Sequence, residues 1–321
     1  MLLEIKDLTV EFTGMRGKLQ ALRKVNLEIE KGEILGVVGE SGSGKSVTAL
    51  SVLGLLEKNA TITSGEILYM GKDLLRLSKK ELQSVRGKQI GMVFQEPMTA
   101  LHPTMRIGSQ LAEVIRRHRK TSKKEAYTLA VEALREVHIH DPDVVARKYP
   151  FELSGGMRQR VVIALAMSAP PELLIADEPT TALDVTIQFE ILKLMKELSR
   201  KRGTSILLIT HDIGVVSHLC DKTVVMYAGE VIEKGSTADV LQRPIHPYTN
   251  ALLHALPDMV SQDEELQSIP GEVVDLRQRP GGCAFFDRCS RAIEVCRIKA
   301  PLLEADASSH NAACWNKEET G

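Results

Sequence analysis

The stretch that most restricts how this chain can fold is Gly39 to Ser46, which reads G-E-S-G-S-G-K-S. The residues before it, 33–38, are mostly apolar and partly β-branched, and those after it, 47–56, follow a buried helical pattern. The sequence therefore predicts a strand, a glycine-rich turn and a helix in direct succession. Glycines in such a turn let backbone N–H groups face phosphate oxygens, and the helix start adds partial positive charge at the same place.

The stretch matches the phosphate-binding loop (P-loop) pattern, G-x-x-x-x-G-K-S. We expect the Lys45 ammonium to reach the β- and γ-phosphates of a nucleotide and the Ser46 hydroxyl to ligate Mg²⁺. The alternative is an ordinary Gly/Ser-rich turn between a strand and a helix. The residues expected to contact the nucleotide are Gly39, Ser41, Gly42, Gly44, Lys45, Ser46 and Val47.

Composition limits the class of protein. The chain has 321 residues, of which 43% are hydrophobic, so one large domain with appendages can bury a core. The net charge is −1, with 41 basic and 42 acidic residues, which gives no electrostatic footprint for nucleic acid. We expect no signal peptide, because Glu4 places a charge at the fourth residue. No apolar run reaches the ~18 residues of a membrane span. We therefore expect a cytoplasmic protein whose membrane role needs a spanning partner.

The strand and helix patterns alternate along the chain as in an α/β protein. Strands are expected at 2–12, 25–29, 63–69 (an edge strand), 90–94, 173–178 and 205–210, with a hairpin of 224–227 and 230–233 as the last β element. Helices are expected at 78–86, 107–119, 122–137, 161–168 and 185–200. Ser78 and Glu81 form a capping-box pattern. Residues 104–149 read as a helical insertion, whose basic run 116–120 is a solvated face or, alternatively, a nucleic-acid contact.

Polar residues follow several of the expected strands. Gln95 and His211 each come directly after one, and Asp177 and Glu178 end another. The carboxyl ends of parallel strands are where such sheets bind ligands. Asp177 can hold Mg²⁺ through water, and Glu178 can polarise a water for attack on a phosphate. Phe12, just before a glycine loop, could stack on an adenine ring or fill the core.

A second glycine-rich helix start follows the insertion. Ser154 is a natural N-cap, and Gly155 and Gly156 expose backbone N–H groups. They form either a second anion site or a plain helix cap.

Taken together, these segments resemble the ATP-binding cassette (ABC) set in order and spacing over residues 1–240. The corresponding parts are Walker A (Gly39–Ser46), the Q-loop (Gln95), the signature (Leu153–Gly156), Walker B (Leu173–Asp177, then Glu178), the D-loop (Ala182–Asp184) and the H-loop (His211). The stretches 94–103 and 246–253, with a cysteine-containing tail, are similar to the D-type ATPase subunit of dipeptide and oligopeptide importers. Nickel importers share this pattern.

This resemblance implies an α/β fold built on a P-loop NTPase core. We expect a mixed sheet in a RecA-like subdomain, an antiparallel β subdomain and a helical subdomain at about 104–168, all within an ABC ATPase domain at 1–240. Residues 241–321 would form the C-terminal Cys-rich extension of the importer family. Two departures from the family pattern are Met157, where glutamine is usual, and Phe12, where tyrosine is common.

The resemblance also implies how the site works. ATP lies between two ATPase subunits, and Ser154 acts on the nucleotide held by the partner. Gly155, Gly156, Asp184 and a stacking Phe12 complete the nucleotide contacts. Mg²⁺ is held by Ser46, Gln95 and Asp177. Glu178 is the general base, His211 positions the γ-phosphate and water, and Gln95 senses both ion and water.

The expected partners are two transmembrane permease subunits, a second ABC ATPase subunit (identical or related) and, indirectly, an extracytoplasmic solute-binding protein. The protein would then lie peripherally on the cytoplasmic face of the membrane and power uptake of di- or oligopeptides. The alternatives are import of nickel or another small solute, and a soluble cassette acting on nucleic acid. The last would need a coiled-coil or zinc insertion or a second cassette, and only one set of motifs is present. A P-loop kinase would have no reason for the signature.

Four of the five cysteines lie in the tail: Cys283, Cys289, Cys296 and Cys314, spaced C-x5-C-x6-C-x17-C. Cys220 stands apart and reads as a small buried hydrophobe. Unlinked thiols would leave a short, glycine- and proline-punctuated segment without a staple, and disulfides suit a cytoplasmic protein poorly. Zinc sites usually show C-x2–4-C knuckles, whereas a [4Fe–4S] cluster takes one thiolate per iron and accepts wider spacings. The sequence predicts a [4Fe–4S] cluster, with Zn²⁺ as the alternative.

Overall fold

The computed structural model describes residues 1–15, 17–181, 183–255, 268–277, 279–303 and 309–317. The chain divides into two compact units. The first unit consists of Met1–Ile29, Ile34–Arg76 and Thr210–Gly321, and the second of Glu30–Glu33 and Leu77–Ile209. Ala182 of the expected D-loop, and residues 256–267, 278, 304–308 and 318–321 of the expected extension, lie outside the described residues.

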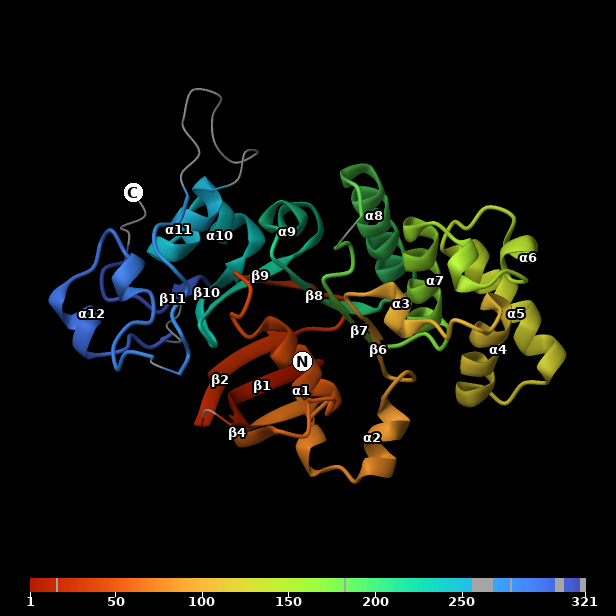
Figure 1. The fold of residues 1–321 in the computed structure, drawn as a ribbon, viewed down its shortest axis with the longest axis horizontal. Coiled ribbons are helices and arrows are strands. Elements are labelled where there is room, and N and C mark those ends of the chain that lie inside the picture. The colour runs from red at the N-terminus through yellow and green to blue at the C-terminus, as the bar shows by residue number, and fades with distance from the viewer. Residues whose placement is uncertain (16, 182, 256–267, 278, 304–308, 318–321) are drawn as a thin grey trace. The chain divides into compact units, whose positions relative to one another are not determined.

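An antiparallel sheet opens the first unit (Figure 1). Its strands are β1 (Leu3–Gly14), β2 (Gly17–Ile29), β4 (Ala60–Tyr69) and β5 (Lys72–Asp73), in the order β2-β1-β4-β5. Their inward side chains, including Leu3, Leu8 and Leu22, are fully buried. The expectation that residues 63–69 form an edge strand was wrong, because β4 pairs with β1 on one side and with the two-residue β5 on the other.

The other strands of the first unit are β3 (Ile34–Val38), β9 (Lys222–Tyr227), β10 (Glu230–Ser236) and β11 (Asn311–Ala312). They lie in the order β11-β10-β9-β3, parallel only between β9 and β3. The β9–β10 hairpin is confirmed, and Ala228 and Gly229 at its turn have positive φ. It is not the last β element, because β11 adds to β10 near the end of the chain.

The helices of the first unit are short. They are α1 (Lys45–Leu53), η1 (Leu74–Arg76), α9 (Ile213–Leu219), α10 (Thr237–Gln242), α11 (Pro247–His254), η4 (Phe286–Arg288) and α12 (Glu294–Ile298). Cys220 caps the end of α9 and is buried, with its sulfur 2.9 Å from the point where a Cβ on Gly36 would lie. The expectation of a small buried hydrophobe at Cys220 is confirmed.

Parallel strands form the sheet of the second unit. β6 (Ile90–Val93), β7 (Leu173–Asp177) and β8 (Ser205–Thr210) lie in the order β8-β7-β6. Every residue of β7 and β8 is buried. Burial on both faces explains why these segments read as continuous apolar runs rather than as alternating patterns.

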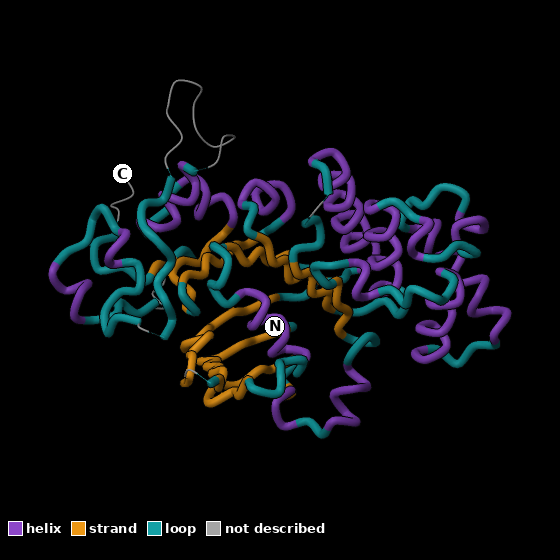
Figure 2. The backbone as a smooth tube through the Cα atoms, viewed as in Figure 1, coloured by secondary structure: helices purple, strands orange, loops and turns teal. Residues whose placement is uncertain are grey.

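Helices make up most of the second unit. They are α2 (Lys79–Val85), α3 (Pro97–Ala100), α4 (Ile107–His118), α5 (Lys123–Glu136), α6 (Pro142–Val145), η2 (Pro150–Glu152), α7 (Gly155–Met167) and α8 (Val185–Arg202). Figure 2 shows α3 to α7 as helices and loops without strands, as the sequence predicts for an insertion. The capping box of Ser78 and Glu81 is confirmed. Arg116 and Arg117 are exposed, as on a solvated face.

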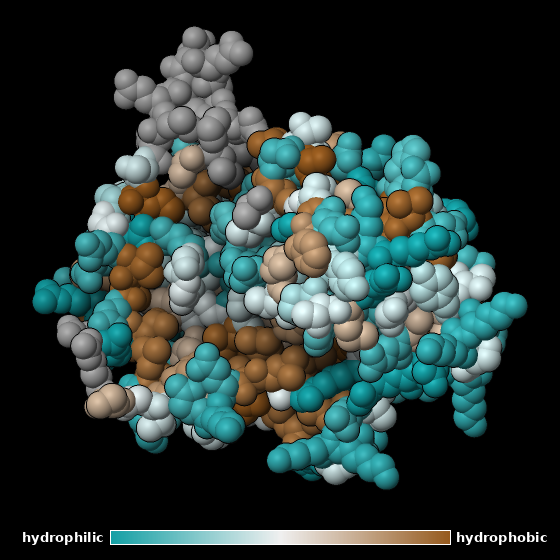
Figure 3. All heavy atoms as spheres, turned by 45° about the vertical axis from the view of Figure 1, so that its right-hand side comes forward, coloured by the Kyte–Doolittle hydropathy of each residue, from teal (hydrophilic) through white to brown (hydrophobic). Residues whose placement is uncertain are grey.

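The surface mixes polar and apolar residues, and hydrophobic side chains gather in patches on the face drawn in Figure 3. Phe151, Val185 and Phe189 of the second unit are more than half exposed. Among the described residues, a helix with the length and apolarity needed to span a bilayer was not found.

Candidate nucleotide site and cysteine cluster

The P-loop of the first unit connects the fully buried β3 to α1. Its conformation requires glycine at two positions. Gly39 has φ +153°, and a Cβ there would lie 2.1 Å from the Met226 carbonyl oxygen. Gly44 has φ +99°, and a Cβ there would lie 2.6 Å from the Leu22 side chain. The backbone of the loop therefore packs directly against neighbouring strands, which fixes its shape before any phosphate binds.

Lys45 lies under this loop. Its side chain is buried, and its ammonium donates to the carbonyl oxygens of Gly39 (2.7 Å) and Glu40 (3.0 Å). These carbonyls hold the cation at the phosphate-binding turn, where phosphate oxygens can replace them as acceptors. The remaining predicted contacts lie on the same loop and helix: Ser41 and Gly42 are exposed, and Ser46 and Val47 are half-buried in the first turn of α1.

Two further predicted residues belong to the first unit. Phe12 is half-buried in β1, where it pairs with Leu19 on one side and Ala60 on the other. His211 is exposed directly after β8. The next residue, Asp212, caps α9 by accepting hydrogen bonds from two backbone N–H groups, so the helix begins immediately after the histidine.

In the second unit the structure brings Gln95 and Glu178 together, although 83 residues separate them in the chain. The Gln95 amide donates to the Glu178 carboxylate (3.0 Å), and the Thr181 hydroxyl donates to the same oxygen (2.9 Å). Glu178 has φ +45°, a conformation that is rare for a residue with a Cβ, and its N–H bonds to the Ile209 carbonyl. Asp177, the last residue of β7, is buried. A strained, half-buried carboxylate with a fixed orientation is typical of a functional site.

The signature lies at the start of α7. Ser154 is the N-cap, and its hydroxyl accepts from the Met157 N–H (3.4 Å). A Cβ on Gly156 would lie 2.8 Å from the Ile187 side chain, so the signature packs closely on the start of α8. Asp184 caps α8 by accepting from the Ile187 N–H (3.0 Å). Ser154 and Gly155 are exposed, so the hydroxyl and the adjoining backbone can be reached by a ligand.

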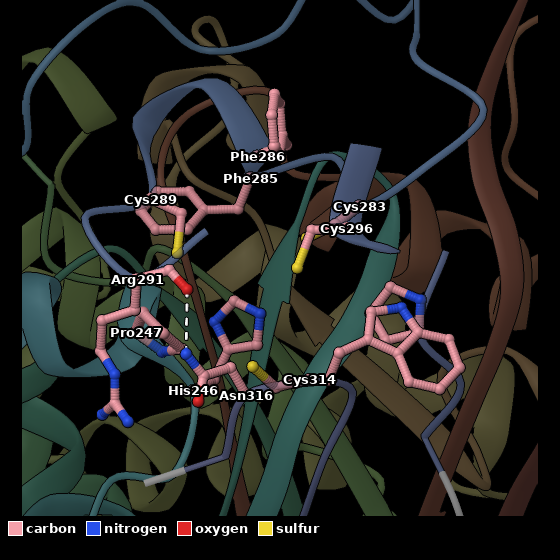
Figure 4. A pocket seen from close by; sticks show the side chains of 12 residues that line it. His246, Pro247, Cys283, Phe285, Phe286, Cys289, Arg291, Cys296, Cys314 and Asn316 are labelled. Carbon is pink, nitrogen blue, oxygen red and sulfur yellow. Dashed lines mark hydrogen bonds between the residues drawn. The ribbon is translucent and has the colours of Figure 1, made fainter. Parts of the chain in front are cut away.

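All four tail cysteines line one pocket, together with His246, Phe285 and Trp315 (Figure 4). The cavity between them has a volume of about 10 Å³, room for roughly one water molecule. Within the described ranges, no three or more His, Cys, Asp or Glu side chains are arranged to hold a metal ion.

Three of the tail cysteines lie in an environment that disfavours thiolates. Burial, with smaller contributions from the other three cysteines, raises the pKa of the Cys283 thiol to about 11. Burial likewise raises the pKa values of Cys289 and Cys314. A cation bound among them would reverse the shifts, because metals bind the thiolate and release its proton.

Reasoning from the sequence missed a set of contacts between the tail and the P-loop. The Arg288 guanidinium donates to both carboxylate oxygens of Glu40, at 2.7 and 3.1 Å. The hydroxyl of Tyr248 accepts a hydrogen bond from the Glu40 N–H (2.9 Å). Glu40 occupies one of the unspecified positions of the P-loop pattern, and Arg288 lies 248 residues further along, so no local signal links them.

The P-loop with its buried lysine, the carboxylates at the end of a parallel strand and the serine-capped glycine pair define a nucleotide-hydrolysing cassette. The model of the ABC transporter family matches residues 22–181, and that of the oligopeptide/dipeptide transporter C-terminal region matches residues 232–296. A model of an AAA domain (putative AbiEii toxin, Type IV TA system) also matches residues 147–217.

Similar proteins match over nearly the whole chain. A probable peptide ABC transporter ATP-binding protein of Sinorhizobium fredii is 49% identical over 99% of this chain and 96% of its own length. The probable D,D-dipeptide transport ATP-binding protein DdpD of Escherichia coli is 49% identical over 99% of this chain and 97% of its own length. The oligopeptide transport ATP-binding protein OppD of Bacillus subtilis is 50% identical over 98% of this chain and 88% of its own length.

Solved structures are similar over the cassette. The ATP-binding cassette MJ0796, solved as a post-hydrolysis dimer with ADP and phosphate, superposes with a TM-score of 0.66 at 29% identity. That match covers 74% of this chain and 99% of MJ0796. CbiO1 of Clostridium perfringens gives a TM-score of 0.64 at 30% identity, over 75% of this chain and 91% of CbiO1.

The chain therefore belongs to the ABC transporter family of ATPase subunits, in the group that carries the oligopeptide/dipeptide transporter C-terminal region. ATP binding and hydrolysis are the activity of this family, and ATP with Mg²⁺ is the ligand that its site accommodates.

Proposed function

We propose that this chain hydrolyses ATP to power the uptake of dipeptides or oligopeptides through membrane-spanning permease subunits. The observation that carries the proposal is the full-length identity of 49–50% to three ATP-binding proteins named for peptide transport. That identity extends through the C-terminal region, where a second family model named for oligopeptide and dipeptide transport also matches.

In the proposed mechanism the P-loop N–H groups and Lys45 bind the phosphates, while Ser46, Gln95 and Asp177 hold Mg²⁺. Phe12 stacks on the base. Glu178 accepts the proton of the attacking water, and its hydrogen bonds to Gln95 and Thr181 orient it for that role. His211 positions the water and the γ-phosphate. Each of these roles is assigned to this chain from the order and spacing of its motifs.

We assign residues 1–240 to the ATPase domain, with its helical subdomain at about 104–168, and residues 241–321 to the extension. A second ABC ATPase subunit completes the site through Ser154, Gly155, Gly156 and Asp184. The exposed apolar side chains of Val185 and Phe189, next to Asp184, support an interface there. The pair lies peripherally on the cytoplasmic face of the membrane against two permeases, supplied by an extracytoplasmic solute-binding protein.

Uptake in the native host tests the proposed substrate. A strain whose only copy of the gene carries Lys45→Ala should lose uptake of a labelled dipeptide or tetrapeptide and keep uptake of ⁶³Ni²⁺. The parental gene should restore peptide uptake. Loss of nickel uptake with peptide uptake intact would assign the chain to a nickel importer instead.

Light scattering of the purified pair tests the shared site. ATP, but not ADP, should produce the dimer, most clearly in Glu178→Gln, and Ser154→Arg should prevent it. A monomer at saturating ATP with the partner present would contradict the assignment of Ser154.

We further propose that Cys283, Cys289, Cys296 and Cys314 hold a [4Fe–4S] cluster, with Zn²⁺ as the alternative. The support is that the four thiols line one pocket. A cluster that takes one thiolate per iron accepts wider spacings along the sequence than the C-x2–4-C knuckles usual for zinc. The group would act as a staple for a tail with little core of its own, since ATP hydrolysis needs no electron.

Anaerobic purification followed by iron, acid-labile sulfide and zinc analysis tests the cluster. Brown protein with equimolar iron and sulfide, lost in Cys296→Ser, is the expected result. Colourless protein with one zinc per chain, even after reconstitution with iron and sulfide, would exclude the cluster.

A further inference from the structure

Glu40 is the second residue of the P-loop, and the tail holds it at two of its three polar groups. Its N–H donates to the Tyr248 hydroxyl (2.9 Å), and its carboxylate accepts two hydrogen bonds from Arg288 (2.7 and 3.1 Å). Its third group, the carbonyl, accepts from Lys45 (3.0 Å). The peptide that orients the phosphate-binding lysine is therefore clamped from outside the loop.

Arg288 itself is fixed in place. Its side chain is 6% exposed, and its Nε donates to the Pro270 carbonyl (2.9 Å). The guanidinium lies 5.8 Å from the ring centroids of both Tyr227 and Phe285. The Glu40 carboxylate raises the pKa of Arg288 above its usual range, so the guanidinium stays charged. A buried, bidentate and aromatic-flanked arginine has little freedom to leave its carboxylate.

A second contact from the tail reaches the loop by another route. Arg279 donates to the Ala228 carbonyl (2.7 Å) in the β9–β10 turn. The next residue of that turn, Gly229, donates its N–H to the Ser43 carbonyl of the P-loop (3.0 Å). A Cβ on Gly229 would lie 2.4 Å from the Ala21 carbonyl, so this turn cannot shift without disturbing β2.

We propose that Arg288 is a positioning residue of the nucleotide site: by neutralising and orienting Glu40 it lets the P-loop accept the phosphates of MgATP. Tyr248 assists by fixing the Glu40 N–H. The C-terminal extension thereby sets the affinity of the ATPase for nucleotide, in addition to any role against membrane partners. The proposal rests on the nucleotide contacts assigned to the P-loop, which Lys45→Ala tests separately.

Charge predicts the direction in which loss of Arg288 changes the affinity for MgATP. Glu40 places a carboxylate on a loop that binds the negatively charged phosphates of MgATP. Paired with Arg288, the carboxylate adds little net field; unpaired, it repels the phosphates. Repulsion of this kind, over distances on the order of 10 Å near a protein surface, changes a binding constant roughly tenfold.

The experiment measures the affinity of the full-length chain for MgATP and MgADP by equilibrium dialysis, at low and high salt. Arg288→Gln should bind MgATP roughly tenfold more weakly than the parent in low salt, and high salt should shrink the difference. Arg288→Lys, which keeps the charge, should stay within about threefold of the parent. The double variant Glu40→Gln/Arg288→Gln should recover to the same range, because no unpaired carboxylate remains. Arg277→Gln, which removes an exposed arginine of the same extension, is the matched control.

Three results would overturn the proposal. The first is that Arg288→Gln binds MgATP as tightly as Arg277→Gln. The second is that the double variant binds MgATP as weakly as Arg288→Gln, which would make the loss of affinity structural rather than electrostatic. If Arg288→Gln does not fold, Glu40→Gln alone decides the question. It should bind MgATP at least as tightly as the parent, and a roughly tenfold loss of affinity would refute the predicted direction of the charge effect. Loss of binding in Lys45→Ala with parental affinity in Arg288→Gln would leave the P-loop assignment intact and remove only this inference.

Discussion

Replacing Glu233 with alanine should detach the C-terminal extension from the strand that carries it. Glu233 lies in β10 with no exposed surface, and its carboxylate binds three groups. One oxygen accepts from the Ile245 N–H (2.8 Å) and from the His310 ring (2.7 Å), and the other accepts from the His246 N–H (2.9 Å). One side chain thus ties two separate segments of the extension to the cassette.

The size of the effect follows from what the alanine leaves behind. A hydrogen bond to a charged group contributes about 1.5 to 3 kcal/mol, and the two backbone N–H groups have no other acceptor at this position. His246 is 2% exposed, so water does not reach its N–H, whereas the N–H of half-buried Ile245 can partly replace the lost bond with one to water. The His310 ring also loses its hydrogen bond to the Glu233 carboxylate. Together these losses destabilise the extension by about 3 to 5 kcal/mol.

Urea unfolding and limited proteolysis measure this loss. The unfolding free energy of Glu233→Ala should fall by about that amount, and cleavage should appear after residue 241 while the cassette resists. Glu233→Gln should lie in between, because it keeps one acceptor but turns an NH₂ group toward an N–H donor. The control is Glu272→Ala, an exposed glutamate of the extension. A change below about 1 kcal/mol, matching the control, would refute the anchoring role of Glu233.

Three more predictions concern other parts of the chain. Glu178→Gln should keep ATP binding and lose about 10²- to 10⁴-fold of turnover in the assembled complex, and near-parental hydrolysis would reject it as the general base. Gly282→Ala places a Cβ 2.2 Å from the Cys296 carbonyl, so its thermal unfolding should show a loss of at least about 2 kcal/mol, whereas Gly281→Ala, which meets nothing within 4 Å, should be neutral. Burial lowers the pKa of His246 from 6.5 to about 4. The unfolded chain therefore takes up that proton first on acidification, and the unfolding free energy of the metal-free chain falls by up to about 3 kcal/mol between pH 6.5 and 4. In His246→Asn the unfolding free energy should depend less steeply on pH over this window. An unchanged pH dependence would contradict the assignment to His246.

Local chemistry made much of the fold predictable. The P-loop, the buried parallel strands and the Ser78 capping box each follow from residues close together in the sequence. The polar residues at strand ends were also recognisable, because the ends of parallel strands meet at one edge. Gln95 and Glu178 are hydrogen-bonded in the structure, as that rule suggests for residues far apart in the chain.

Long-range pairings left no such signal. β11 has two residues, too few for any periodicity, and its partner in β10 is about 80 positions away. The link between Arg288 and Glu40 joins a basic residue of the tail to an unspecified position of the P-loop, and either residue alone reads as a solvated charge. The misassigned edge strand has the same origin, since the two-residue β5 that covers β4 shows no strand pattern.

The hydrogen bonds of Lys45 to the carbonyls of Gly39 and Glu40 make nucleotide binding an exchange reaction. The loop carries an internal competitor for its own cation, so the lysine contributes to affinity only the difference between phosphate and carbonyl as acceptors. A substitution of Lys45 removes the lysine–phosphate contact and also the lysine–carbonyl bonds that compete with it. The measured loss of affinity therefore understates the strength of the lysine–phosphate contact itself. The same competitor keeps a buried ammonium solvated by protein between turnovers, so that the empty loop stays folded and ready for the next nucleotide.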